Sequence, residues 1–172
     1  MGELIAYYSR RGQNLVNGTV RTLRVGNTEL VAAIIQKFTG ADMFRIEPCQ
    51  DYPGDYCRCI DLARQDLLRS VRPEIKNCPD SLDRYDTIYL GFPNYWGTMP
   101  MAVFTFLESF DFSGKVIRPF CTYEDGGMGH SIEDLENLCP KAYIARGLPI
   151  RGAEVGNELP AIEEWTGMKE PM

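Results

Sequence analysis

Short apolar segments alternate with amphipathic segments along most of this chain, and no other feature restricts its fold as much. Five runs are typical of strands, at residues 4–8, 43–47, 85–92, 115–123 and 142–150. Apolar residues at helical spacing follow each run: between Gly26 and Gly40, over 60–71, over 103–110, over 131–138, and around Ile162 and Trp165. Parallel strands need such crossover helices, so the alternation predicts an α/β protein with a parallel sheet between two helical layers.

Polar residues at the helix starts suggest how several helices begin. Asn27 or Thr28 is expected to cap the first helix, and Gly40 to end it. Ser131 and Asp134 have the spacing of a capping box, and Asn157 is expected near the cap of the last helix.

Composition limits the class of protein further. The chain has 172 residues, which predicts one domain over 1–172, and its net charge of −6 disfavours nucleic acid and anionic membranes as partners. No apolar run reaches the roughly 18–20 residues of a membrane span, and no signal peptide is recognisable at the start. Six cysteines with one histidine predict reduced thiols in a cytoplasmic protein and no metal site.

Ligands of open parallel sheets bind beyond the carboxyl ends of the strands, which here means the loops 9–28, 93–98 and 122–130. The first loop ends at a helix start, where unpaired N–H groups suit a phosphate, and it contains arginines in a chain that is otherwise acidic. Its candidate phosphate ligands are Ser9, Arg10, Arg11, Gly26, Asn27 and Thr28. Neither a nucleotide P-loop nor a dinucleotide fingerprint is present, and a simple helix cap is the alternative.

The other two loops carry aromatic residues and glycines. Tyr95 and Trp96 could stack on a flat ring, or they could be core residues beneath the next helix. Three glycines leave the backbone of the third loop free to line the edge of a ring, and Tyr123 adds another aromatic face. His130 has no evident nucleophile beside it and is interpreted as a surface or helix-capping residue, so no catalytic residue is assigned.

Taken in order, the segments YYSR, GNTELVA, GFPNYWGTMPMAVFTFLE, TYEDGGMGHS and GLPIRG resemble the flavodoxins, specifically bacterial flavodoxin-like proteins with a long first loop. The resemblance implies a five-stranded sheet of order 2-1-3-4-5 and one bound FMN. It implies that the FMN phosphate lies at Ser9, Gly26, Asn27 and Thr28. Flavodoxins usually leave this loop uncharged, but residues 1–26 here carry a net charge of +3, so we also expect Arg10 or Arg11 to reach the phosphate. It further implies that the flavin ring lies between two sets of residues: Pro93, Asn94, Tyr95, Trp96 and Gly97 on one side, and Thr122, Tyr123, Glu124, Gly126, Gly127 and Gly129 on the other.

One departure from compact flavodoxins is the insertion at residues 12–25. Asn17-Gly18 sits between apolar residues and predicts a hairpin turn. The inserted hairpin is either a solvated decoration or a platform for a partner or substrate.

The favoured function is that of an FMN-binding electron-transfer protein, a monomer that exchanges electrons with redox partner proteins. The alternative is an FMN-dependent NAD(P)H:quinone or related oxidoreductase on the same fold. Arg10, Arg11, Arg21 and Arg24 would then hold a pyridine-nucleotide phosphate. A phospho-acceptor receiver domain is disfavoured because no acidic cluster follows the first strand.

Overall fold

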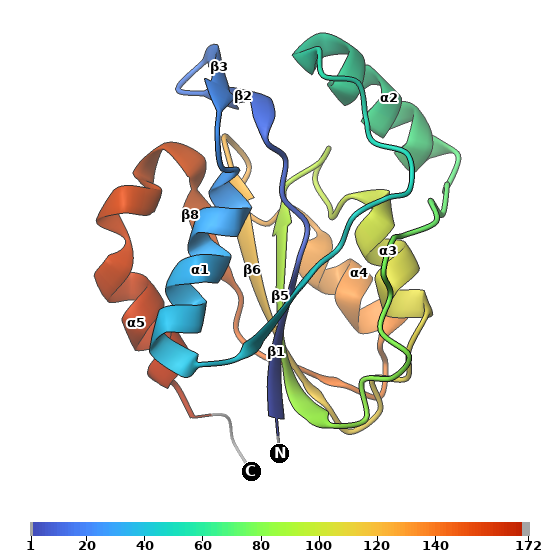
Figure 1. The fold of residues 1–172 in the computed structure, drawn as a ribbon, viewed down its shortest axis with the longest axis vertical. Coiled ribbons are helices and arrows are strands. Elements are labelled where there is room, and N and C mark those ends of the chain that lie inside the picture. Colours follow the sequence, from blue (N-terminus) through green and yellow to red (C-terminus); the bar gives the residue numbers. More distant parts are fainter. Residues whose placement is uncertain (1, 170–172) are drawn as a thin grey trace.

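A parallel sheet runs through the middle of the molecule, with its carboxyl ends toward the top of Figure 1. The computed structural model describes residues 2–169. Its strands lie in the order β4-β1-β5-β6-β7, which is 2-1-3-4-5 when these strands are numbered along the chain, and a short β8 also pairs with β6. The strands are β1 (Gly2–Tyr7), β4 (Asp42–Arg45), β5 (Tyr85–Pro93), β6 (Val116–Tyr123), β7 (Tyr143–Ile144) and β8 (Leu148–Arg151). The predicted fold class and strand order are confirmed.

The fifth position of the sheet differs from the prediction, because two short strands replace the continuous strand expected over 142–150. Between them the backbone leaves the ladder. The carbonyl of Arg146 accepts a hydrogen bond from Trp165 Nε1 at 2.8 Å. Gly147 packs so closely that an added Cβ atom would lie 2.5 Å from Met128 Sδ. Contacts with Trp165 and Met128, rather than strand pairing, therefore determine the backbone path at Arg146 and Gly147.

Two helices cover each face of the sheet. They are α1 (Asn27–Thr39) and α5 (Leu159–Gly167) on one face, and α3 (Met101–Glu108) and α4 (Ser131–Leu138) on the other (Figure 1). Side chains alternate between the faces of a strand, so β1 contributes to both cores. Ile5 packs in the core beneath α1 and α5, whereas Leu4 and Ala6 pack in the core beneath α3 and α4.

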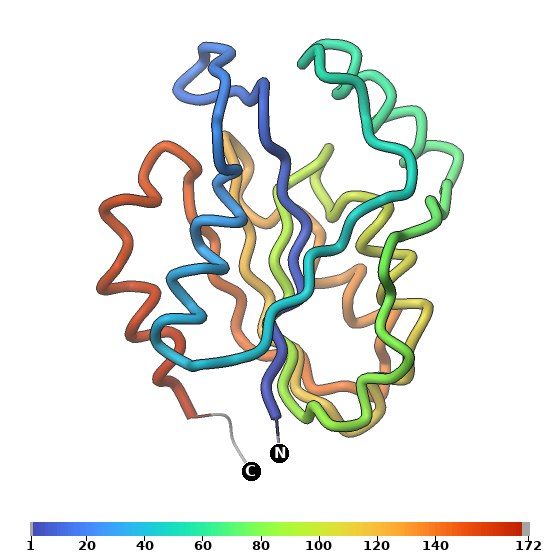
Figure 2. Tube along the Cα trace, in the orientation of Figure 1, coloured from blue at the N-terminus to red at the C-terminus, as the bar shows by residue number. Residues whose placement is uncertain are grey.

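Two further elements rise above the carboxyl ends of the strands (Figure 2). The first is a hairpin of β2 (Gly12–Val16) and β3 (Thr19–Leu23), and the second is helix α2 (Tyr56–Leu68). The hairpin turns at Asn17 and Gly18, whose φ angles of 51° and 76° are those of a type I′ turn. The predicted hairpin in the first loop is therefore confirmed.

Helix α2 begins and ends earlier than the prediction of 60–71. The Asp55 side chain accepts a hydrogen bond from Arg58 N at 2.9 Å and caps the helix, which therefore begins at Tyr56, four residues before Ile60. The chain turns at Ser70, where φ is 51°, so Val71 lies beyond the helix.

The helix starts also differ from the predicted caps. Gly26 occupies the N-cap of α1, and Glu158 that of α5, where Asn157 instead ends a short 3₁₀ helix, η1 (Gly152–Asn157). The capping box is wrong as well: within residues 2–169 the buried Ser131 hydroxyl has no hydrogen-bond partner, and Asp134 accepts a bond from Thr98.

All six cysteines are free thiols, three of them buried. Within residues 2–169, no helix is long and apolar enough to cross a membrane.

A buried arginine joins β6 to the end of α5. Arg118 is only 5% exposed, and its guanidinium donates to the carbonyls of Trp165 and Met168 at 2.5 and 3.2 Å. The same guanidinium lies 5.0 Å from the centre of the Trp165 ring. A cation at the carboxyl end of a helix is stabilised by the helix dipole, so Arg118 fixes α5 to the sheet.

We expect Arg118→Met to lower the free energy of unfolding by about 2–4 kcal/mol, because it removes charge-assisted hydrogen bonds from a buried site. Urea denaturation measures this loss. The control is Arg84→Met, because Arg84 is 75% exposed in its ion pair with Asp42. It should cost no more than about 0.5 kcal/mol. Equal losses in the two variants would contradict the anchoring role.

Candidate functional site

A cavity of about 640 Å³ opens at the carboxyl ends of β1, β5 and β6 and reaches up between the hairpin and α2. Most of the residues predicted to bind a cofactor line it: Ser9, Arg10, Asn27, Thr28, Pro93, Asn94, Tyr95, Trp96, Gly97, Thr122, Tyr123, Glu124, Gly126 and Gly129. Arg11, Gly26 and Gly127 lie next to this lining without forming part of it. The structure therefore brings the three predicted loops together at one site.

The first loop closes tightly on the start of α1. The Ser9 hydroxyl accepts a hydrogen bond from Glu29 N at 3.1 Å. A residue just after β1 therefore caps the N-terminus of α1. Gly26 allows this approach, because an added Cβ atom would lie 2.1 Å from Ser9 Oγ and 2.6 Å from the Arg10 carbonyl oxygen. The two ends of the inserted hairpin are therefore in contact with each other, at Ser9 and Arg10 on one side and at Gly26 on the other.

Unpaired donors gather at this point. Among the residues that the structure describes, the backbone N–H groups of Arg10, Arg11, Asn27 and Thr28 have no hydrogen-bond partner. Beside them, the buried hydroxyls of Thr28 and Thr122 lie 2.7 Å apart, so one of the two can donate elsewhere. Backbone donors at a helix N-terminus with a hydroxyl beside them are the donor set that binds phosphate.

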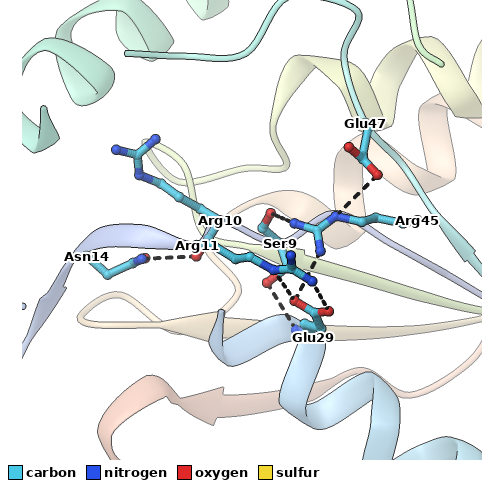
Figure 3. A network of polar contacts seen from close by, with 7 residues as sticks. All are labelled: Ser9, Arg10, Arg11, Asn14, Glu29, Arg45 and Glu47. Carbon is cyan, nitrogen blue, oxygen red and sulfur yellow. Dashed lines mark hydrogen bonds and ion pairs between the residues drawn. The ribbon is translucent and has the colours of Figure 1, made fainter. Parts of the chain in front are cut away.

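Two of the four arginines of the first loop, Arg10 and Arg11, are bonded to protein groups, and Figure 3 shows the bonds of Arg11. The Arg11 guanidinium pairs with Glu29 at 2.8 Å, and the hydrogen bond from Arg11 holds the pKa of the Glu29 carboxyl below its usual value. Arg45 adds a second ion pair to Glu29 and donates to the Ser9 carbonyl at 3.1 Å. The Arg10 side chain points away from this network.

The second loop makes a tight turn at Trp96 and Gly97. Their φ angles are 57° and 89°, and backbone hydrogen bonds join Tyr95 and Thr98 on either side, which is the pattern of a type I′ turn. A left-handed conformation at a tryptophan costs about 1–2 kcal/mol, so the surrounding contacts must hold it. The Gly97 carbonyl accepts a hydrogen bond from His130 N at 2.8 Å, which ties the second loop to the third.

The two aromatic residues of this loop have different surroundings. The Tyr95 ring packs edge-on against Tyr8, with ring centres 5.8 Å apart, and its hydroxyl is buried without a hydrogen-bond partner in residues 2–169. Burial raises the pKa of Tyr95 well above its usual value. Trp96 is 46% exposed, and its Nε1 donates to the Ile60 carbonyl of α2 at 2.8 Å. Trp96 is therefore the residue better placed to meet a ligand.

Asn94 and Gly129 brace the third loop against the second. The Asn94 side chain accepts from Gly97 N and donates to the Gly127 carbonyl, both at 2.8 Å. Gly129 has a φ of +55°, and an added Cβ atom would lie 2.1 Å from the Gly97 carbonyl oxygen. Within the described part of the chain, the N–H groups of residues 124–126 have no partner, so they can bind the polar edge of a ring.

His130 is half-exposed at the N-cap position of α4 and makes no side-chain cap bond. Its ring lies 3.5 Å from Asp134, as a surface residue that contacts its own helix.

The wall that α2 and the hairpin contribute to the cavity was not predicted from the sequence. The cavity-lining residues outside the predicted set are Asn14, Leu15, Tyr56, Cys59, Ile60, Ala63, Asp125 and Gly152. Their apolar spacing on α2 resembles that of any helix facing a core. Apolar spacing does not show whether a helix faces a core or a cavity, so the sequence carries no separate signal for this wall.

We expect Gly129→Ala to lower the free energy of unfolding by about 2–3 kcal/mol, because the new methyl group collides with Gly97 in a backbone conformation already unfavourable for alanine. The control is Gly127→Ala. Its φ of +59° is similar, but nothing lies within 4 Å of the added atom, so about 1 kcal/mol is expected. Chemical denaturation compares them, and equal losses would refute the close contact.

This chain is similar in sequence and in structure to known flavin-binding proteins. A family model described as flavodoxin matches residues 21–166. A candidate flavoprotein from Bacteroides uniformis is 26% identical, with 95% of this chain and 96% of that one covered and a TM-score of 0.75.

Two more distant structures share the fold. A flavoprotein from Lactobacillus acidophilus in complex with FMN is 18% identical, with 91% and 97% covered and a TM-score of 0.66. An NADPH-quinone reductase from P. pentosaceus is 13% identical, with 99% and 100% covered and a TM-score of 0.58. No curated protein matches the chain. Because the family model spans most of the sequence, the chain belongs to the flavodoxin family.

Proposed function

We propose that this protein binds one FMN in the cavity and transfers electrons through it. The observation that carries the proposal is the cluster of unpaired backbone donors at residues 10–11 and 27–28, at one end of a cavity whose other end has aromatic residues. FMN has a phosphate at one end and a flat ring at the other, so the residues present fit it. The cavity volume of about 640 Å³ also lies in the usual range for cofactor sites. When bound, FMN supplies the redox chemistry, in steps of one or two electrons.

In this proposal the phosphate lies at Ser9, Arg10, Arg11 and Gly26–Thr28. The N–H groups of the helix start and the hydroxyl of Thr28 donate to it. The Arg11 guanidinium is paired with Glu29, so Arg11 takes part through its unpaired backbone N–H.

The flavin ring lies between the second and third loops. Trp96 and Tyr123 provide the aromatic faces, and the free N–H groups of Glu124 and Gly126 meet the polar edge of the ring. Pro93, Asn94, Gly97, Thr122, Gly127 and Gly129 shape the two loops, and Tyr95 supports them from below.

We further propose one domain over 1–172, working as a cytoplasmic monomer with a reductase and an acceptor as partner proteins. The hairpin stands beside the phosphate end of the cavity, with Arg21 exposed on β3 and Arg24 exposed just after it. This basic surface on an acidic protein can orient a partner during encounter.

An oxidoreductase acting on a small molecule is the second candidate, and the apolar wall of α2 favours it. For a pyridine-nucleotide phosphate, Arg10 and Arg11 are already bonded to protein groups, which leaves Arg21 and Arg24 of the four arginines named for this role.

Titration of the apoprotein with FMN tests the main proposal. We expect one equivalent of FMN to bind, and Thr28→Ala to weaken binding by about 1–3 kcal/mol because a buried partner is lost. Thr39→Ala is the control, since its hydroxyl bonds to Ile35 at the far end of the same helix, and it should leave affinity unchanged. A protein that takes up no FMN after reconstitution would overturn the proposal.

Fluorescence of bound FMN tests the stacking arrangement. We expect Trp96→Ala and Tyr123→Ala each to restore part of the quenched emission and to weaken binding by about 0.5–1.5 kcal/mol. Tyr95→Phe keeps the buried ring and removes only its unpaired hydroxyl, so emission should not change. A response to Tyr95→Phe, with none to Trp96→Ala, would reverse the assignment of the two rings.

A further inference from the structure

Helix α2 supplies one wall of the cavity. None of the FMN contacts proposed above involves a residue of α2, although Trp96, which is proposed to stack on the flavin, donates to the Ile60 carbonyl of this helix. The cavity-lining residues of α2 are Tyr56, Cys59, Ile60 and Ala63. Their spacing of three, four and seven residues puts them on one face of the helix. Leu15 of β2 lines the cavity as well. The wall is therefore apolar along its length, with a single phenol at the amino end of the helix.

Hydrogen bonds to both neighbouring loops hold this wall in place. Tyr56 N donates to the Gln13 side chain at 2.7 Å, and Arg10 donates to the carbonyls of Pro53 and Gly54, both at 3.0 Å. At the other side Trp96 Nε1 reaches the helix backbone. The main contacts of α2 are with β2 and α3 rather than with the sheet. Polar bonds thus help to orient the inward face of α2, on which Cys59 and Ala63 are buried.

The chemistry of the wall selects against charged ligands. Burial raises the pKa values of Tyr56 and Cys59, so both groups are neutral at pH 7. Among the described residues that line the cavity, Arg10 is the one cation, and its guanidinium already donates to the carbonyls of Gln13, Pro53 and Gly54. The face of α2 that lines the cavity thus carries no charged side chain.

The same wall suits a flat, uncharged molecule. Within residues 2–169 the Tyr56 hydroxyl has no hydrogen-bond partner, so it can donate to a carbonyl oxygen of a ligand. Ile60 and Ala63 offer apolar surface beside it, and Trp96 lies at the edge of the same compartment. A flat conjugated ring that carries a carbonyl group fits this arrangement, because the Tyr56 hydroxyl can donate to the carbonyl and the apolar residues of α2 can contact the ring.

We propose that Tyr56, Cys59, Ile60 and Ala63, together with Leu15, form a second compartment that binds an uncharged planar quinone beside the cofactor. The inference rests on the proposed function, which supplies the electrons. Reduction of a quinone to its quinol consumes two electrons and two protons and converts both C=O groups into C–OH groups. The electrons are those that the protein carries, and the protons come from water.

The test uses FMN-loaded protein and menadione, a small quinone, with binding measured by calorimetry under anaerobic conditions. Ala63→Trp fills the compartment, so we expect the menadione Kd to rise at least tenfold while the FMN Kd stays within about twofold. Leu62→Trp adds the same side chain to the half-exposed neighbour, which does not line the cavity, and it should change neither constant. Reoxidation of the reduced protein by menadione should slow in parallel in Ala63→Trp only, while reoxidation by cytochrome c should not change.

A second variant covers the case in which Ala63→Trp does not fold. Tyr56→Phe removes one hydroxyl, and we expect the menadione Kd to rise by about three- to tenfold at unchanged FMN affinity. Menadione binding that is absent, or equal in all three variants, would overturn the second compartment. Loss of FMN binding in Ala63→Trp would overturn it too, since the wall would then belong to the FMN site. Failure of the wild-type protein to bind FMN would instead overturn the proposed function.

Discussion

The whole upper half of the molecule depends on the contact between the end of β1 and the start of α1. Ser9 caps a helix that begins more than 15 residues later in the chain, and this is possible only because Gly26 has no side chain to separate them. The contact places the unpaired N–H groups of the two segments beside each other. Because the contact brings the two ends of the hairpin together, the fold accommodates this insertion without a change in the sheet.

A second brace joins the loops after β5 and β6. Asn94 bonds to both loops, and the N–H of His130 holds the carbonyl of Gly97. These bonds hold Trp96 in a backbone conformation that a tryptophan rarely adopts. The aromatic end of the cavity is therefore preorganised by polar contacts, in the same way as its phosphate end. Preorganisation lowers the entropy lost when a ligand binds.

The sheet, its order and the hairpin turn could be predicted from the sequence, because apolar periodicity and an Asn-Gly turn are local signals. The split of the fifth strand could not, since it depends on Met128 and Trp165, which are distant in sequence. The same holds for Arg10, which looks like a phosphate ligand in sequence but donates to backbone carbonyls more than 40 residues away. For the site, the three loops were foreseen and the α2 wall was not, because apolar spacing does not reveal whether a helix faces a core or a cavity.

The position of α2 has a consequence for how the two ends of the site communicate. Arg10 belongs to the donor cluster through its backbone and to the start of α2 through its guanidinium. On the opposite side the hairpin tip is bonded to the third loop, where Gly18 N donates to Glu124 at 2.9 Å. The hairpin and α2 are thus both linked by polar bonds to backbone that would contact FMN. The cores beneath α1 and α3 are instead closed by apolar packing. The bonds from Arg10 therefore couple the start of α2 directly to the donor cluster at the phosphate end of the site.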